Sequence, residues 1–374
     1  MANQSQARLY RASAVIAFPK VDQFLDPILS SIATHDITVV LQAEGYAILT
    51  PFGKASIAMQ AGELHIAVET HDAHAFNRLK HTLVGPISFI AASEDLTIEW
   101  AGDEAGLTPM DDLRTLRVKT ATMLTPCMRR VVFEGEDLAR FDRADQLHCR
   151  LIFQPKNIAA PQWPALDDRG HVVWAGQRKL DTRVYTIRAI DVAKGELTID
   201  FALHAQAGPA TQWARAASVG DMVGIVGPAA NGPKPAAFYV LAGDETGLPG
   251  IARILEGLDK DARGVAFIEI ADVSAQQTIA HPPGIVVQWL HRDGMAPGTT
   301  LLLPEAVRSV VWPADLNQAF FWGGCEHKAF REIHRMLRHD IGLPRERQVL
   351  YSHWHRSLSE EQIIAEGAKA YLPE

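Results

Sequence analysis

An arginine, a tyrosine and a threonine stand within four consecutive residues, Arg183-Val184-Tyr185-Thr186. An arginine guanidinium is a planar fork of N–H donors that matches a pair of phosphate oxygens, and a tyrosine ring can lie on a flat heteroaromatic face. Strand alternation places Arg183 and Tyr185 on one face, so Thr186 would reach the same ligand through its backbone or where the strand twists. The three groups suit a flavin dinucleotide, although such a tetrapeptide also occurs in ordinary half-exposed strands.

A second segment follows the first and offers an anion site. Leu197 to Leu203 alternates apolar and polar residues, as a half-buried strand does. The run Gly208-Pro209-Ala210-Thr211 then permits a tight turn and the start of a helix, whose free N–H groups attract anions. We therefore expect the FAD pyrophosphate between Arg183 and this turn. His204 and Trp213 flank the turn and are candidate cofactor contacts, or else a surface histidine and a core tryptophan.

With these motifs the chain resembles the siderophore-interacting protein family, FAD-dependent ferric-siderophore reductases related to the ferredoxin–NADP reductases. The resemblance covers roughly residues 112–372. The motifs that carry it are RVYT at 183–186, DFALHAQAGPATQWA at 200–214, Gly220-Asp221 before Gly227-Pro228, LAGDETGLPGIARILEGL at 241–258 and FFWGGCEHKAFREIHRMLR at 320–338. In that family the arginine, aromatic and hydroxyl positions of the first motif bind FAD. These positions match Arg183, Tyr185 and Thr186 here, and the family's GPA turn matches Gly208 to Thr211.

The resemblance implies a redox reaction. Electrons would come from NAD(P)H or reduced ferredoxin, pass through FAD and reduce the Fe(III) of a ferric siderophore. Fe(II) would then be released, because hard oxygen donors hold it less tightly. The flavin carries the chemistry, so we expect no catalytic acid, base or nucleophile and no resident metal. Two alternatives stay open: a general flavin reductase that serves free flavin, quinone or a partner protein, and a non-catalytic siderophore-binding protein.

The later motifs supply candidates for a cleft that receives nicotinamide or substrate. The helix expected from Glu326 to Arg338 carries an apolar stripe and a basic stripe, the latter formed by Lys328, Arg331, Arg335 and Arg338. The basic stripe is either a solvated face or a surface that attracts NADPH phosphates, an acidic ferredoxin or an anionic chelate. The full set of cleft candidates is Asp244, Glu245, Thr246, Gly324, Glu326, Lys328, Arg331 and Trp354.

The composition fits a soluble multidomain enzyme. The chain has 374 residues, of which 47% are hydrophobic and 21% charged, enough for two or three buried cores. Its formal net charge of −8 argues against a nucleic-acid partner. The sequence shows no apolar run of the about 18 residues that a membrane span needs. Cys127, Cys149 and Cys325 are widely spaced, so we expect no disulfide framework and a cytoplasmic location.

Three successive patterns indicate three domains. We expect residues 1–105 to form a small α+β module, with helices covering one face of a mainly antiparallel sheet. The strands expected there include Ala7–Phe18, Ile37–Thr50 and Leu96–Trp100, and the helices are Val21–Thr34 and Ala73–Val84. This segment resembles a small domain of unknown function that is fused ahead of some siderophore-interacting proteins.

The remainder of the chain divides into two further patterns. Residues 112–230 show short strands separated by turns, typical of an antiparallel β-barrel, here one that binds FAD. Gly170–Val173 and Arg183–Asp191 are two of the expected strands. Residues 235–374 alternate strands and helices, which predicts a parallel α/β sheet of the NAD(P)H-binding kind. There we expect Asp244 or Thr246 to cap a helix that has Pro249 in its first turn.

Overall fold

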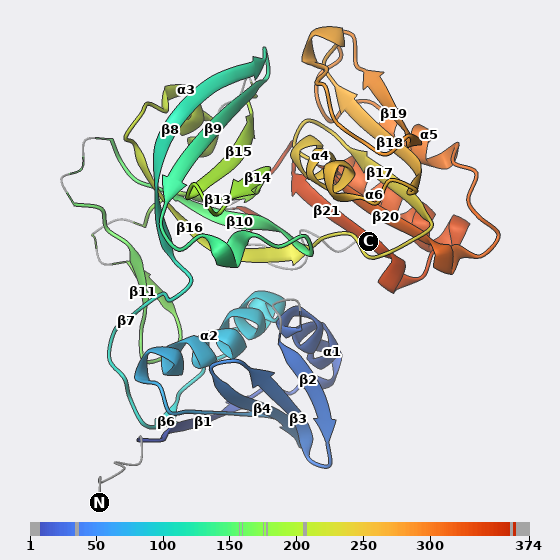
Figure 1. Ribbon diagram of the computed structural model, residues 1–374. Coiled ribbons are helices and arrows are strands. Elements are labelled where there is room, and N and C mark those ends of the chain that lie inside the picture. The colour runs from blue at the N-terminus through green and yellow to red at the C-terminus, as the bar shows by residue number, and fades with distance from the viewer. Residues whose placement is uncertain are drawn as a thin grey trace, which may run out of the picture.

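The computed structural model describes residues 8–33, 37–156, 158, 160–174, 176, 179–204, 208–359 and 362–363. Three parts follow one another along the chain: an N-terminal α+β module, a curled antiparallel sheet and a parallel α/β sheet (Figure 1). Each part packs around a buried apolar cluster. This is the architecture that the sequence predicts. None of the described helices is long and apolar enough to cross a membrane.

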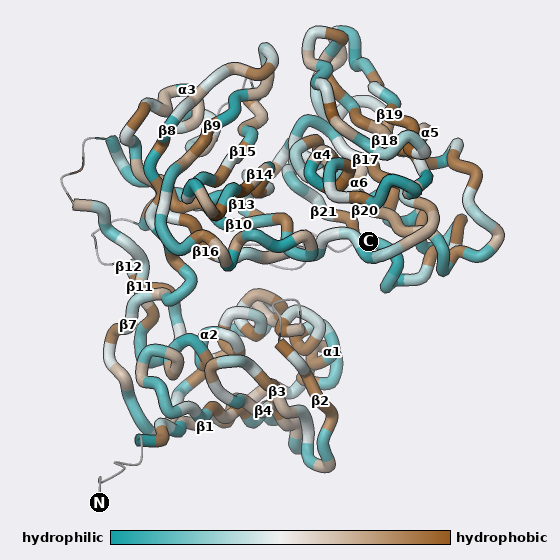
Figure 2. Tube along the Cα trace, in the orientation of Figure 1, coloured by the Kyte–Doolittle hydropathy of each residue, from teal (hydrophilic) through white to brown (hydrophobic). Residues whose placement is uncertain are grey.

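The N-terminal module is a six-stranded antiparallel sheet with two helices on one face. Its strand order is β2-β3-β4-β5-β1-β6. Its elements are β1 Tyr10–Ala17, α1 Val21–Ile32, β2 Thr38–Gln42, β3 Gly45–Thr50, β4 Gly53–Gln60, β5 Glu63–Thr70, α2 Ala73–Ile90 and β6 Ala101–Gly102. Alternate residues of the strands, such as Ile16 and Ile57, are buried against helix residues such as Phe76. Figure 2 shows that the edge strand β2 is mostly hydrophobic.

Two strand predictions for this module are wrong. The stretch expected as one strand from Ile37 to Thr50 is a hairpin: residues 43–44 form the turn, and Gly45 begins the returning strand with φ +105, a conformation that favours glycine. Leu96 to Trp100 is not a strand, and only the next two residues pair with β1. Helix α2 also extends beyond the expected end at Val84, because the turns that follow bury Ile87 in the module's core.

The second part is a seven-stranded antiparallel sheet of the order β13-β10-β16-β8-β9-β15-β14. Its elements are β8 Arg114–Thr125, β9 Met128–Gly135, β10 Gln146–Phe153, β13 Thr182–Thr186, β14 Ala189–Asp191, β15 Glu196–Ala202, α3 Pro209–Ala216 and β16 Met222–Asn231. The strand expected from Arg183 to Asp191 is divided in two. Ile187 still donates to Leu147 O (2.8 Å), whereas Arg188 already donates to Thr198 O (2.9 Å). β13 is thus an edge strand, paired with β10 alone.

The connection between β10 and β13 leaves the barrel. It forms the hairpin of β11 Pro164–Leu166 and β12 Val172–Trp174, which pairs with β7 Thr108–Pro109. The strand expected at Gly170–Val173 therefore belongs to this small sheet and not to the barrel, because its pairing partners are β11 and, through it, β7. The hairpin lies beside α2 of the N-terminal module (Figure 1).

The third part is a five-stranded parallel sheet of the order β19-β18-β17-β20-β21. Its elements are β17 Phe238–Gly243, α4 Leu248–Gly257, β18 Arg263–Ile270, β19 Gly284–His291, α5 Leu302–Arg308, β20 Ala319–Glu326, α6 His327–Arg335 and β21 Gln348–Trp354. Helix α4 packs on one face of the sheet, and α5 and α6 pack on the other. The strand order reverses between β17 and β20, and such switch points bind ligands in open α/β sheets.

Two details of this sheet differ from expectation. Gly247, rather than Asp244 or Thr246, is the N-cap of α4, although Pro249 does lie in its first turn. The helix expected to run to Arg338 is α-helical to Arg335 and continues as a π-helical turn over Met336–Ile341. The apolar stripe still faces inward, because Ile333, Met336 and Leu337 are buried in the core beneath the helix.

Candidate functional site

Strand β13 carries the first group of predicted site residues. Tyr185 lies opposite Cys149 of β10, and its ring centroid is 4.5 Å from that of Phe201. Thr186 is buried on the other face, opposite His148, and Val184 on that face is 51% exposed. The alternation predicted from the sequence is therefore observed, with Arg183 on the Tyr185 side. The Arg183 Nη1 donates to Thr182 O (2.7 Å).

Helix α3 carries the second group. Gly208 is its N-cap in an extended conformation, and Pro209 occupies the first turn, as the sequence predicts. Among the described residues, no atom other than those of Gly208 and its chain neighbours lies within 4 Å of a Cβ built at Gly208, so the helix start is open on this side. Ala210 and Thr211 are buried in that first turn, where N–H groups have no partner within the helix. The arrangement leaves donors for an anion.

Phe201 joins these two groups, and sequence reasoning missed it. Its ring centroid lies 4.5 Å from that of Tyr185 and 5.8 Å from that of Trp213. Trp213 also packs on Phe133 and Phe153 in the barrel core, so its ring supports α3 from beneath. The alternating pattern of β15 marks Phe201 as inward-facing, which is the only sequence signal for its role.

His204 and Trp354 meet across the boundary between the barrel and the α/β sheet. Their ring centroids are 5.5 Å apart and the rings are stacked. The His204 carbonyl accepts a hydrogen bond from Arg215 of α3 (2.8 Å), and the Trp354 indole N–H donates to Asp244 Oδ2 (2.8 Å). Two predicted residues from distant motifs are therefore brought together, and Arg215 ties the pair to the last turn of α3.

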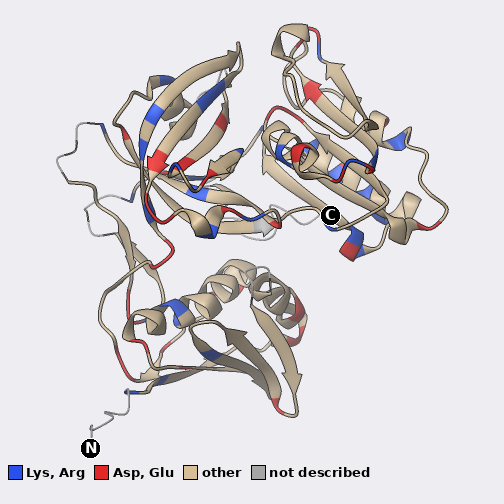
Figure 3. Cartoon of the chain, in the orientation of Figure 1, with Lys and Arg blue, Asp and Glu red and all other residues tan. Residues whose placement is uncertain are grey.

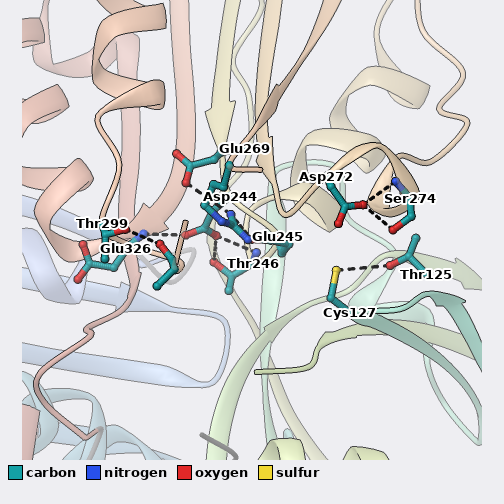
Figure 4. Close-up of polar contacts among 12 residues, drawn as sticks. Thr125, Cys127, Asp244, Glu245, Thr246, Glu269, Asp272, Ser274, Thr299 and Glu326 are labelled. Atoms are coloured by element: carbon teal, nitrogen blue, oxygen red, sulfur yellow. Dashed lines mark hydrogen bonds and ion pairs between the residues drawn. The ribbon is translucent and has the colours of Figure 1, made fainter. Parts of the chain in front are cut away.

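Asp244 is the centre of a polar cluster at the switch point (Figure 4). Its Oδ1 accepts from Thr246 N (2.8 Å) and Thr246 Oγ1 (2.6 Å), and its Oδ2 accepts from Glu326 N (2.9 Å) as well as Trp354. Glu326 in turn caps α6, because its carboxylate accepts from Lys328 N (2.6 Å). Carboxylates of the chain itself thus occupy the N–H donors at this edge.

The neighbouring Glu245 is used within the protein. It forms a buried ion pair with Arg292, whose guanidinium also lies 3.4 Å from Glu269 Oε1. Burial raises the pKa of Glu269, although the guanidinium opposes the shift. Gly324 has a packing role in the same region, since a Cβ there would meet the His353 ring at 2.3 Å. Glu245 and Gly324 are therefore both used inside the protein, Glu245 in an ion pair and Gly324 in close packing against His353.

A pair of buried histidines joins the barrel to the α/β sheet. The ring of His148 meets the ring of His353 edge-on at 5.2 Å, and His353 Nδ1 lies 3.3 Å from Thr246 Oγ1. Neither Nε2 has a hydrogen-bond partner among the described residues. Burial lowers the pKa of both rings, so both are neutral at pH 7. Sequence reasoning missed His148, whose position is meaningful only once the pairing of β10 with β13 is known.

Lys328 and Arg331 lie in a groove along α6, away from the β13 group. The groove has a volume of about 1060 Å³ and is lined by five cationic side chains, Lys328, Arg331, Arg335, Arg338 and Arg356, against two carboxylates, Glu326 and Glu332. Figure 3 shows the blue basic residues of α6 on the α/β part. None of the Lys328, Arg331, Arg335 and Arg338 side chains bonds to another part of the chain that the structure describes. The basic stripe predicted from the sequence thus faces an open groove.

The first two groups fit FAD. An open helix start with buried first-turn residues suits a pyrophosphate, and a tyrosine ring held by Phe201 suits one face of an isoalloxazine. The cleft candidates divide into the buried cluster around Asp244 and the basic groove on α6. The cleft candidates, which the sequence groups together, thus lie in two different environments, one buried and acidic and the other open and basic.

Comparisons with known proteins agree with this geometry. The model of the siderophore-interacting FAD-binding domain matches residues 117–232, and that of the siderophore-interacting protein matches residues 236–357. The ferric vibriobactin reductase ViuB of Vibrio cholerae is 30% identical over 235 residues, which cover 62% of this chain and 85% of ViuB. The NADPH-dependent ferric-chelate reductase of Escherichia coli is 30% identical over 249 residues, which cover 65% and 92%.

Solved structures give the same result. A siderophore utilization protein from T. fusca is 33% identical with a TM-score of 0.57, over 69% of this chain and 96% of that protein. The siderophore-interacting protein SipS from Aeromonas hydrophila is 27% identical with a TM-score of 0.58, over 70% and 98%. The family models match the barrel and the α/β sheet in turn, and the N-terminal module lies outside both. This chain belongs to the siderophore-interacting protein family.

Proposed function

We propose that this protein is a ferric-siderophore reductase that holds FAD and passes electrons from NAD(P)H to siderophore-bound Fe(III). The observation that carries the proposal is that Phe201 contacts both Tyr185 of β13 and Trp213 of α3, the helix that begins at Gly208, in a chain of this family. When bound, FAD accepts an electron pair and delivers single electrons, which Fe(III) requires. Fe(III) is substrate, and reduction lets the hard oxygen donors of the siderophore release it.

The residues of β13 and α3 would bind and orient FAD. Arg183 and the N–H groups of Gly208 to Thr211 would hold the pyrophosphate, because a guanidinium and a helix start both favour phosphate oxygens. Tyr185 would cover one ring face, while Thr186, buried on the opposite face of the strand, would contribute its backbone. Val184, His204 and Trp213 would frame the site, and the chemistry needs no side chain as proton donor.

The nucleotide donor would bind along α6. The carboxylates of Asp244 and Glu326 occupy the N–H groups at the switch point, so phosphate is disfavoured there. Phosphates of NADPH would instead lie on the basic groove, with Lys328 and Arg331 nearest the Glu326 end. Thr246, Gly324 and Trp354 would line the way from the groove to the flavin.

Reduced ferredoxin is the second candidate donor. The basic surface of α6 would attract an acidic protein as well as a nucleotide, since the rest of the chain is net acidic. We place the reaction in the cytoplasm, because Cys127, Cys149 and Cys325 are free thiols, as a reducing compartment maintains them.

An anaerobic absorbance titration tests the proposed function. NADPH or NADH should bleach the bound flavin, and a ferric siderophore with a ferrous trap should then restore its colour. Iron-free siderophore and free flavin are the matched control acceptors. Flavin that bleaches and passes electrons to free flavin but to no ferric chelate would instead identify a general flavin reductase. Protein that cannot be loaded with flavin would indicate a binding protein without this activity.

Replacing Arg183 tests the placement of the pyrophosphate. We expect Arg183→Ala to weaken FAD binding by about 1.5–3 kcal/mol, since it removes a charge-assisted hydrogen bond to phosphate. Titration of flavin-free protein with FAD, followed by flavin fluorescence, measures the change. Arg117→Ala, on β8 of the same barrel, is the matched control. Equal FAD affinity in the Arg183 variant and the control would move the pyrophosphate elsewhere.

Replacing Arg335 tests the placement of the nucleotide. We expect Arg335→Gln to raise the KM for NADPH about tenfold and to leave that for NADH nearly unchanged, because only NADPH carries a 2′-phosphate. Arg308→Gln, at the exposed end of α5, is the control. A rise in the KM for the ferric chelate with none for NADPH would assign the groove to the iron substrate.

A further inference from the structure

The hairpin of β11 and β12 is held by donors of the N-terminal module through its backbone. Asn77 Nδ2 donates to Leu166 O (3.3 Å) and Lys80 Nζ to Asp168 O (2.8 Å). The Trp100 indole donates to Arg169 O (3.1 Å), and the His81 Nδ1 lies 2.8 Å from Gly170 O. The N-terminal module therefore contacts four backbone carbonyls within residues 166–170 at the tip of the hairpin.

The contact is reciprocal and buried. The Asp168 carboxylate accepts hydrogen bonds from Ala105 N (2.7 Å) and Gly106 N (2.8 Å) in the segment that leaves the module. Asn77 and Lys80 are almost completely buried, although they are polar residues in the middle of a helix. Burying a lysine is costly unless hydrogen bonds compensate for the lost water, so this contact is built to persist.

The same hairpin precedes the FAD strand along the chain. β13 begins eight positions after the hairpin ends at Trp174, and it carries Arg183 and Tyr185. As the edge strand of the barrel, β13 pairs with β10 alone, from Ile152 opposite Thr182 to His148 opposite Thr186. Among the described residues no strand pairs with the other side of β13, so its position depends on β10, on the Arg253 contact at Ile187 and on the chain that enters it.

We propose that the N-terminal module sets the affinity of the protein for FAD by holding the β11–β12 hairpin, and with it the entry to β13. This inference rests on the FAD site of the proposed function. Asn77, Lys80, His81 and Trp100 are positioning residues, which act on FAD through the hairpin and β13. Holding a binding strand in place before the ligand arrives lowers the entropic cost of binding.

Gly170 offers a way to release the hairpin without touching the FAD site. It takes φ +82, and a Cβ there would lie 2.7 Å from the His81 N and from the Lys80 carbonyl carbon of α2. Because those atoms are backbone, they cannot move aside, and Gly170→Ala should push the hairpin off the helix. Gly62 takes φ +83 in the turn between β4 and β5, where the nearest atom to a Cβ is 3.6 Å away. Gly62→Ala is therefore a control with the same backbone strain and no collision.

The test compares FAD binding with hairpin exposure in the full-length protein. Flavin-free wild type, Gly170→Ala and Gly62→Ala are titrated with FAD, and hydrogen–deuterium exchange is followed over residues 164–174. We expect Gly170→Ala to raise both the exchange rate and, by about tenfold, the Kd for FAD, whereas Gly62→Ala changes neither. Faster exchange of the hairpin with a Kd within about twofold of wild type would overturn the inference.

A milder variant keeps the test decisive if Gly170→Ala does not fold. Trp100→Phe removes the indole donor to Arg169 O and keeps an aromatic ring, so it should loosen the hairpin with a smaller rise in the Kd for FAD. A loosened hairpin with unchanged FAD affinity in this variant also overturns the inference. If wild type itself does not bind FAD, the proposed function fails instead, and the two failures are thereby distinguished.

Discussion

The barrel meets its two neighbours through differently built contacts. Toward the N-terminal module it offers backbone carbonyls of a hairpin that extends away from it, and Lys80 and Asn77 supply the donors. Toward the α/β sheet the contact is made by the barrel itself. Arg253 of α4 donates to Ile187 O and Arg143 O, and the His148 ring contacts the rings of Trp322 and His353. The first contact reaches β13 through an intervening segment, and the second lies at its end.

The two contacts lie at different distances along the chain from β13, which determines how directly each can affect FAD binding. Ile187 directly follows Thr186, so a shift in the second contact moves the FAD strand at once. A shift in the first contact must pass through the hairpin. We therefore expect both contacts to affect FAD affinity and stability, with larger effects when the α/β contact is perturbed than when the module contact is. Three substitutions test this ranking.

The largest effect is expected for Arg253→Met. Its guanidinium donates to Ile187 O (2.8 Å) and Arg143 O (2.7 Å), and the methionine leaves both carbonyls without this donor. We expect a loss of about 3 kcal/mol in unfolding free energy and a weaker affinity for FAD. Urea unfolding and FAD titration measure the two effects, with Arg263→Met, an exposed arginine at the start of β18, as the control. A stability loss without any change in FAD affinity would contradict the ranking.

A smaller effect is expected for Asn77→Leu. The substitution removes the donor to Gly106 O (2.7 Å), Thr108 Oγ1 (3.2 Å) and Leu166 O, and the last two acceptors belong to buried residues. We expect the free energy of unfolding to fall by about 2 kcal/mol, because a buried acceptor that loses its donor keeps its desolvation cost. Differential scanning calorimetry measures the shift against Lys54→Met, an exposed residue of β4. Indistinguishable melting of the two variants would show that the module contact contributes no stability.

The smallest effect, about 1 kcal/mol, is expected for Lys80→Met and depends on pH. Burial lowers the pKa of Lys80 below its usual value of 10.5, so the folded state releases this proton more readily than the unfolded state does. Wild type should therefore gain unfolding free energy relative to Lys80→Met as pH rises through the interval between the lowered pKa and 10.5. Parallel urea unfolding curves from pH 7 to about pH 10 measure the difference. A difference that shrinks over this interval would mean that Lys80 is stabilised in its charged form.

The strands and helices that bury one face could be predicted from the sequence, because their periodicity is local. β1 and β15 appear close to the expected positions, and so does the switch from antiparallel to parallel sheet. The division of the strand expected from Arg183 to Asp191 could not be predicted, since it depends on Leu147 and Thr198 as separate partners. Pairings between distant segments leave little trace in a local pattern.

The candidate site shows the same limit. Local chemistry was enough to nominate Arg183 and the turn at Gly208, whereas Phe201 and His148 gain meaning only from the strands beside them. Lys80 is instructive, because a lysine on a helix is ordinarily read as a solvent-facing residue. Its burial requires a second surface against α2, and the sequence gives no sign that a loop of the barrel supplies it.

The three cysteines differ in burial, so the protein can be labelled at a single native site. Cys149 and Cys325 are fully buried, and burial raises the pKa of each thiol, so neither should react with alkylating reagents in the folded state. Cys127 is only partly buried and packs against the apolar cluster between the barrel and the α/β sheet, so reagents can reach it although burial raises the pKa of its thiol too. A fluorophore attached there would sit on the seam between barrel and sheet. Native alkylation thus yields a single-site label for the opening of that seam.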